Sequence, residues 1–96
     1  MSAEIQLSDG IIKIAGKLDF ASSQQLASET SCWPTSGDIE VDCSAVQHSN
    51  SAGLAFLLEW MKIAQQKSRQ IKYHNVPEQL LVIARAYGID EQLPLA

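Results

Sequence analysis

The sequence predicts an α/β domain with a mixed sheet, in which strands and helices follow the order β-β-α-β-α-β-α. Short segments whose apolar residues alternate, the period of a strand, are interleaved with segments whose apolar residues recur every three or four positions, the period of a helix. A helix that connects two strands makes them parallel, whereas a tight turn makes a pair antiparallel. With 96 residues and neither repeat nor linker, the chain 1–96 is expected to form a single domain.

The first two strands are expected around residues 5–7 and 12–15, where apolar side chains alternate on both sides of Asp9-Gly10. This dipeptide favours the two-residue turn of a hairpin. A short amphipathic helix is then predicted over residues 20–28, with Asp19 as its N-cap.

The second half of the chain alternates strand and helix patterns. Residues 39–43 alternate as a strand, and the longest helical pattern covers residues 51–67. A further strand is predicted at residues 71–74. The last helix should begin near Pro77, because proline suits the first turn of a helix, and should stop at Gly88.

The composition excludes several classes of function. The net charge is −4 and no cluster of Lys and Arg is present, which argues against binding to nucleic acid. No apolar run approaches the ~20 residues that span a bilayer, and no secretory signal begins the chain, so we expect a cytoplasmic protein without direct membrane insertion. Cys32 and Cys43 are too few for a disulfide framework or a zinc site and are expected to stay reduced.

No catalytic residue, cofactor site or metal site is predicted, so an enzyme is not expected. His48 and His74 have no partner at a suitable spacing, and the glycine motifs that bind phosphate or dinucleotides are absent from the sequence. Glu40 and Asp42 alternate along one strand and should share one solvated face.

The apolar residues of the central helix occupy two sides of it. The stripe expected to face the sheet consists of Leu54, Leu57, Leu58, Met61 and Ala64. Phe56 and Ile63 lie nearly opposite this stripe and Trp60 lies between the two sides, so packing on the sheet alone would leave them in water. Either they are anchors for a partner protein, or the N-terminal helix or the C-terminal tail packs over them.

Residues 48–54 join a strand to the central helix and place Ser51 at the start of that helix. The first turn of a helix presents unpaired N–H groups and a partial positive charge. A serine there can cap the helix, contact a partner or carry a phosphate, and all three roles stay open. We therefore name Asn50 and Ser51 as candidate partner-binding residues that act through hydrogen bonds.

These segments resemble a STAS domain over nearly the whole chain. The resemblance is carried by the strand end at residues 41–44, the serine loop at 49–54 with the apolar helix after it, and the strand end at 75–77. Within the family, residues 55–58 and 80–90 are most similar to the MlaB type, the small cytoplasmic STAS subunits of Mla phospholipid transporters.

The resemblance implies a non-catalytic subunit that binds the ATPase subunit (MlaF-like) of an ABC phospholipid transporter and supports its assembly and activity. Through this partner it would lie at the cytoplasmic face of the inner membrane, meet the permease and lipid-binding subunits only indirectly, and contribute to outer-membrane lipid asymmetry. In MlaB-like proteins the hydroxyl residue at the start of the central helix belongs to the ATPase-binding surface, and Ser51 occupies that position.

The alternative that the resemblance implies is an anti-sigma-factor antagonist that acts as a serine phospho-switch. In such proteins the matching serine is phosphorylated and follows an aspartate, which makes Ser51 a candidate phosphorylation site. Here Asn50 precedes the serine, and Ala52 replaces a second small polar or glycine position. The sequence therefore departs from the pattern of the phospho-switch.

Overall fold

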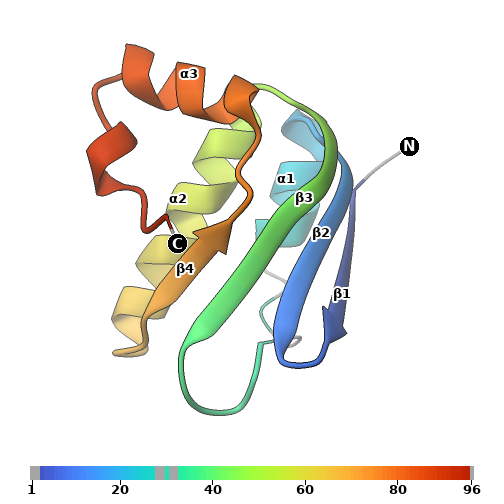
Figure 1. Cartoon of the computed structure of the whole chain (residues 1–96), viewed down its shortest axis with the longest axis vertical. Helices are drawn as coiled ribbons and strands as arrows, with labels where there is room; N and C mark the ends of the chain where they lie inside the picture. The colour runs from blue at the N-terminus through green and yellow to red at the C-terminus, as the bar shows by residue number, and fades with distance from the viewer. Residues whose placement is uncertain (1–2, 28–29, 31–32, 96) are drawn as a thin grey trace.

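The computed structural model describes residues 3–27, 30 and 33–95 of the chain. Its sheet has the strand order β1-β2-β3-β4, and helices α1 and α2 lie behind the sheet in the view of Figure 1, so that the front face stays open. The elements follow one another in the predicted order, which confirms the α/β fold.

The first pair of strands is antiparallel, and β2 with β3 and β3 with β4 are parallel, which confirms the mixed sheet. The strands are β1 (Glu4–Ser8), β2 (Ile11–Leu18), β3 (Ile39–Ser49) and β4 (Ile71–His74). The helices are α1 (Phe20–Ala27), α2 (Ser51–Gln66), α3 (Glu78–Ala86) and the short 3-10 helix η2 (Asp90–Gln92). None of the described helices is both long and apolar enough to span a bilayer.

The hairpin between β1 and β2 turns at the predicted dipeptide. Asp9 has a φ of 53° and Gly10 a φ of 79°. Two successive positive φ angles are what a type I′ turn requires, and this turn matches the twist of the strands that it joins. Asp19 directly precedes α1, and its carbonyl accepts a hydrogen bond from the Ser23 N–H at 2.9 Å.

Strand β3 is longer than its apolar alternation predicts. It continues past Cys43 to Ser49, which pairs with Leu18 at the end of β2. The pairing of β2 with β3 shifts register twice along this stretch. Such irregularities break the alternation of side chains between the two faces, which is why the pattern ends early in the sequence. As a result only Asn50 separates β3 from α2.

Helix α3 begins at Glu78, and Pro77 stands just before it in an extended conformation rather than in its first turn. The helix therefore begins next to Pro77, as predicted, but the proline is its N-cap and does not stand in the first turn. Gly88 has a φ of 71° and follows the C-cap residue Tyr87, so it ends the helix as predicted.

The C-terminal tail lies along the outer edge of β4. Leu93 is buried, the Pro94 carbonyl accepts a hydrogen bond from the Tyr73 N–H at 2.8 Å, and Leu95 forms a parallel bridge with Tyr73. This contact covers an edge of the sheet that would otherwise present unpaired backbone groups.

Helix α2 is covered on two sides by its own chain. Leu54, Leu57 and Ala64 of the predicted stripe are buried, while Leu58 and Met61 are half-buried. These residues follow the predicted side of the helix.

The prediction that a partner protein covers Phe56 and Trp60 is wrong, because they are 2 % and 0 % exposed within this chain. Helix α1 packs against α2, and the rings of Trp33 and Trp60 meet in a T-shaped arrangement with centroids 5.3 Å apart. Phe56 packs beside Trp60 with ring centroids 4.8 Å apart. The alternative prediction, that the N-terminal helix packs over these residues, fits the structure. Ile63 is half-buried.

We expect Phe56→Ala to lower the free energy of unfolding by about 3 to 5 kcal/mol, because it removes a buried aromatic side chain and leaves a cavity. Urea denaturation measures the change. Val82→Ala is the control: Val82 is 51 % exposed, so its loss should stay within about 1 kcal/mol. Equal, small losses for both variants would show that α1 does not cover Phe56.

Candidate docking site at the start of helix α2

Asn50 makes the turn from β3 into α2 and caps the helix. Its backbone is extended, with φ −139° and ψ −165°, and its side-chain Oδ1 accepts a hydrogen bond from the Ala52 N–H at 2.9 Å. Its carbonyl accepts from the Gly53 N–H, also at 2.9 Å. The capping role considered for Ser51 is therefore wrong: Asn50 is the N-cap, and Ser51 is the first helical residue.

Gly53 allows α2 to begin this close to the sheet. A Cβ atom at this position would lie 3.1 Å from Leu18 Cβ and 3.2 Å from the Leu18 carbonyl oxygen, which is tighter than ordinary van der Waals contact. The first turn of α2 thus packs directly on the end of β2. This contact and the Asn50 cap fix where the Ser51 hydroxyl lies.

Three exposed side chains of α2 form one ridge. Ser51, Ala55 and Glu59 are exposed and follow one another at a spacing of four, which places them on one face of the helix. Because α1 and the loop at Trp33 cover the neighbouring face, this ridge is the part of the helix start that a partner can reach.

A shallow groove of about 510 Å³ lies between this ridge and α1. We call it the α1–α2 groove. Ser23 and Gln24 border it from α1, the ridge borders it from α2, and the nearly buried Phe56 lies at its floor.

The α1–α2 groove combines apolar surface with few polar groups. Of the residues that the structure describes, Glu59 is the one charged residue that lines it. Ser23 is 5 % exposed, and its buried hydroxyl finds no hydrogen-bond partner among the described residues. Buried hydroxyls are normally paired, so this hydroxyl is an exception.

The five residues that were predicted to bind a partner differ in exposure and in position. Asn50 and Ser51 are exposed at the helix start, and Phe56 contributes only the floor of the groove. Trp60 is fully buried, so a partner could reach it only by displacing the packing described above. Ile63 is half-buried further along the helix and does not line the groove.

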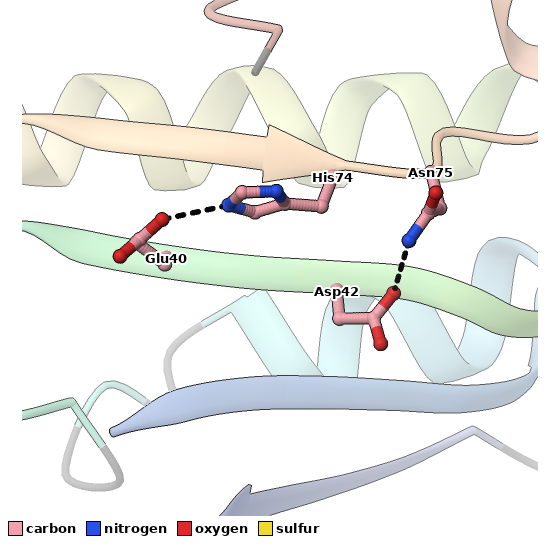
Figure 2. Close-up of polar contacts among 4 residues, drawn as sticks. All are labelled: Glu40, Asp42, His74 and Asn75. Carbon is pink, nitrogen blue, oxygen red and sulfur yellow. Dashed lines mark hydrogen bonds and ion pairs between the residues drawn. The ribbon is translucent and has the colours of Figure 1, made fainter. Parts of the chain in front are cut away.

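A second polar cluster lies on the open face of the sheet, across β3 and β4 (Figure 2). His74 Nε2 lies 2.7 Å from Glu40 Oε1, and Asn75 Nδ2 donates to Asp42 Oδ1 at 3.2 Å. Glu40 and Asp42 share one face as predicted, but they are half-buried and paired. The sequence could not reveal these partners, because the parallel register of β3 and β4 brings together residues more than 30 positions apart.

These contacts tie β3 to β4. Asp42 Oδ1 also accepts a hydrogen bond from the Ser44 N–H at 2.9 Å, and this backbone hydrogen bond is the largest cause that lowers the pKa of Asp42. Desolvation opposes it, and the Asn75 amide and the charge of Lys13 lower the pKa further. The cluster thus holds Asp42 as a carboxylate that joins two strands.

Within the described ranges, no three His, Cys, Asp or Glu side chains come together in a way that could hold a metal ion. Cys43 is a free, buried cysteine, and burial raises the pKa of its thiol to about 12. The thiol therefore stays protonated and is a poor nucleophile. Cys32 lies outside the described residues.

Comparison with known proteins gives one matching family. A family model described as "Mlab, STAS domain" matches residues 1–95. A comparison with curated protein sequences finds no match.

Solved structures show the same fold at low sequence identity. The anti-sigma factor antagonist SpoIIAA in its unphosphorylated form is 13% identical with a TM-score of 0.70, over 99% of this chain and 88% of that chain. An anti-sigma factor antagonist from Mycobacterium paratuberculosis is 21% identical with a TM-score of 0.65, over 98% and 83%. A murine solute carrier 26 anion transporter is 16% identical with a TM-score of 0.61, over 98% of this chain and 20% of that chain.

We expect Asn50→Ala to lower the free energy of unfolding by about 1 kcal/mol, because the Ala52 N–H loses its cap. Ser51→Ala should change it by less than about 0.5 kcal/mol, because its side chain is exposed and makes no capping bond. Urea denaturation of both variants measures these changes and shows which residue caps the helix. A larger loss for Ser51→Ala would assign the cap to the serine.

The lowered pKa of Asp42 predicts a pH dependence. Because the folded-state pKa lies below the ordinary value of 3.8, the carboxylate stabilises the fold above that pH, and this stability is lost as the pH falls through the lowered pKa. Asp42→Asn keeps an acceptor for Ser44 but cannot titrate. The difference in unfolding free energy between wild type and Asp42→Asn should be constant above about pH 5 and change in favour of the variant below 3.8. A difference that is flat down to acid pH would contradict this account.

Proposed function

This chain belongs to the STAS domain family of the MlaB type, and on that premise we propose that it is a docking subunit of a phospholipid ABC transporter. It binds the ATPase subunit of the complex and supports its assembly and activity. Through this partner it lies at the cytoplasmic face of the inner membrane and contributes to outer-membrane lipid asymmetry.

One observation carries the proposal: Ser51 is an exposed hydroxyl residue in the first turn of α2, at the edge of the α1–α2 groove. Asn50 caps the helix and Gly53 lets it pack on the end of β2, so the start of α2 does not depend on the Ser51 side chain. A neutral hydroxyl in a fixed position suits hydrogen bonding to a partner.

The surface around Ser51 fits a contact that depends on a few residues. Ala52 and Ala55 supply apolar area, and Ser51 with Asn50 supplies polar groups that fix the orientation of the partner. Interfaces commonly depend on a small number of such positions. Ile63, half-buried beyond the groove, extends the proposed contact along the helix.

The second candidate is an anti-sigma-factor antagonist that works as a serine phospho-switch. The observations that favour it are the likeness to antagonists of this kind and the exposure of Ser51, which a kinase could reach. A phosphate there adds about −1.5 to −2 charge units and would expel a partner that binds a neutral hydroxyl. We rank this candidate second because Asn50, rather than an aspartate, precedes the serine.

The test is to tag the chain at its native expression level, solubilise membranes in mild detergent and identify co-purifying proteins by mass spectrometry. We expect wild type to recover an ABC ATPase with its permease and lipid-binding subunit. Ser51→Asp should reduce this recovery about tenfold or more, because the new carboxylate has to be desolvated in the interface. It should leave the fold intact, because an acidic residue is favourable at a helix N-terminus.

Ser36→Asp is the matched control, since Ser36 is an exposed serine in the loop before β3 and does not line the groove. It should recover the ATPase as well as wild type does. Recovery of a soluble histidine-kinase-like protein in place of the ATPase would favour the phospho-switch. Equal recovery with Ser51→Asp would place the docking surface elsewhere.

A further inference from the structure

Glu59 lies at the far end of the α1–α2 groove and is exposed. Within residues 3–27, 30 and 33–95 it forms no ion pair, whereas Glu78 pairs with Arg85 at 3.1 Å and Glu40 lies 2.7 Å from His74. As the only charged residue among the described ones that line the groove, Glu59 gives the groove one negatively charged end. A carboxylate in this position favours a cationic group in whatever fills the groove.

Ser23 lines the opposite wall of the groove. Its hydroxyl is buried and finds no partner among the described residues, so an incoming side chain cannot reach it and Glu59 is the group that it meets.

The middle of the groove is apolar. Between Ser51 and Glu59 the helix presents Ala52, Ala55 and the floor at Phe56. The two polar ends are eight residues apart along α2, which corresponds to roughly 12 Å. A lysine or arginine side chain has this character, since its aliphatic stem packs on apolar surface while its charged head donates several hydrogen bonds.

We propose that the α1–α2 groove receives a basic side chain of the ATPase, whose stem lies along Ala55 and whose charged head pairs with Glu59. This inference rests on the proposed function and adds the chemistry that the partner must present. The net charge of −4 on the chain also favours a basic partner surface.

The experiment measures the affinity of the purified chain for the ATPase recovered in the co-purification above, at low and at high salt. Glu59→Gln should weaken binding about tenfold and flatten its salt dependence, because it removes the charge and keeps the size. Glu59→Lys should weaken it more than a hundredfold, because like charges then meet.

Glu91→Gln is the matched control. Glu91 is an exposed glutamate of η2 that does not line the groove, so its replacement should change the affinity by less than twofold. Circular dichroism of each variant checks that the fold is kept, which is expected because both glutamates are exposed.

Two results would overturn the inference in distinguishable ways. One result is that Glu59→Gln and Glu59→Lys bind the ATPase as wild type does, while Ser51→Asp still fails to recover it. In that case the inference of a basic side chain at Glu59 is wrong and the proposed function stands. If wild type recovers no ATPase at all, the proposed function falls and this inference falls with it.

Discussion

Trp60 is fully buried against Trp33, and Phe56 packs beside it. Because α2 carries apolar side chains on two sides, the sheet alone cannot cover it, and α1 with the loop at Trp33 covers the second side. Packing on these two sides determines which part of α2 is exposed to solvent. It leaves the ridge of Ser51, Ala55 and Glu59, and it creates the groove between that ridge and α1.

At the start of α2, the residues that stabilise the helix differ from the residue that we propose to contact a partner. Asn50 caps the helix and Gly53 brings it onto the end of β2, so the helix start is held without help from Ser51. The serine is therefore able to serve a partner, and its replacement should act on binding rather than on folding. The same arrangement suits both candidate functions, since a docking contact and a phosphorylation site each require an exposed hydroxyl in a fixed position.

The sequence predicts well what depends on neighbouring residues. The turn at Asp9-Gly10, the strand at 71–74 and the stop at Gly88 follow from local backbone preferences. The order of elements and the segments that resemble a STAS domain also lead to the correct family. Features that depend on packing between distant segments were missed or left open. The extension of β3 depends on its irregular pairing with β2, the burial of Phe56 on the path of α1, and the contact of Glu40 with His74 on the register of β3 and β4.

The docking surface that we propose is the α1–α2 groove, and the open face of the sheet is the alternative surface. Site-specific photo-crosslinking in cells tests the proposal directly, with a photoreactive residue at Gln24 beside the groove or at Lys72 on the open face. Both side chains are exposed, so neither replacement should disturb the core. The account predicts a covalent adduct of this chain with an ABC ATPase from position 24 and none from position 72. An adduct from position 72 alone would contradict it.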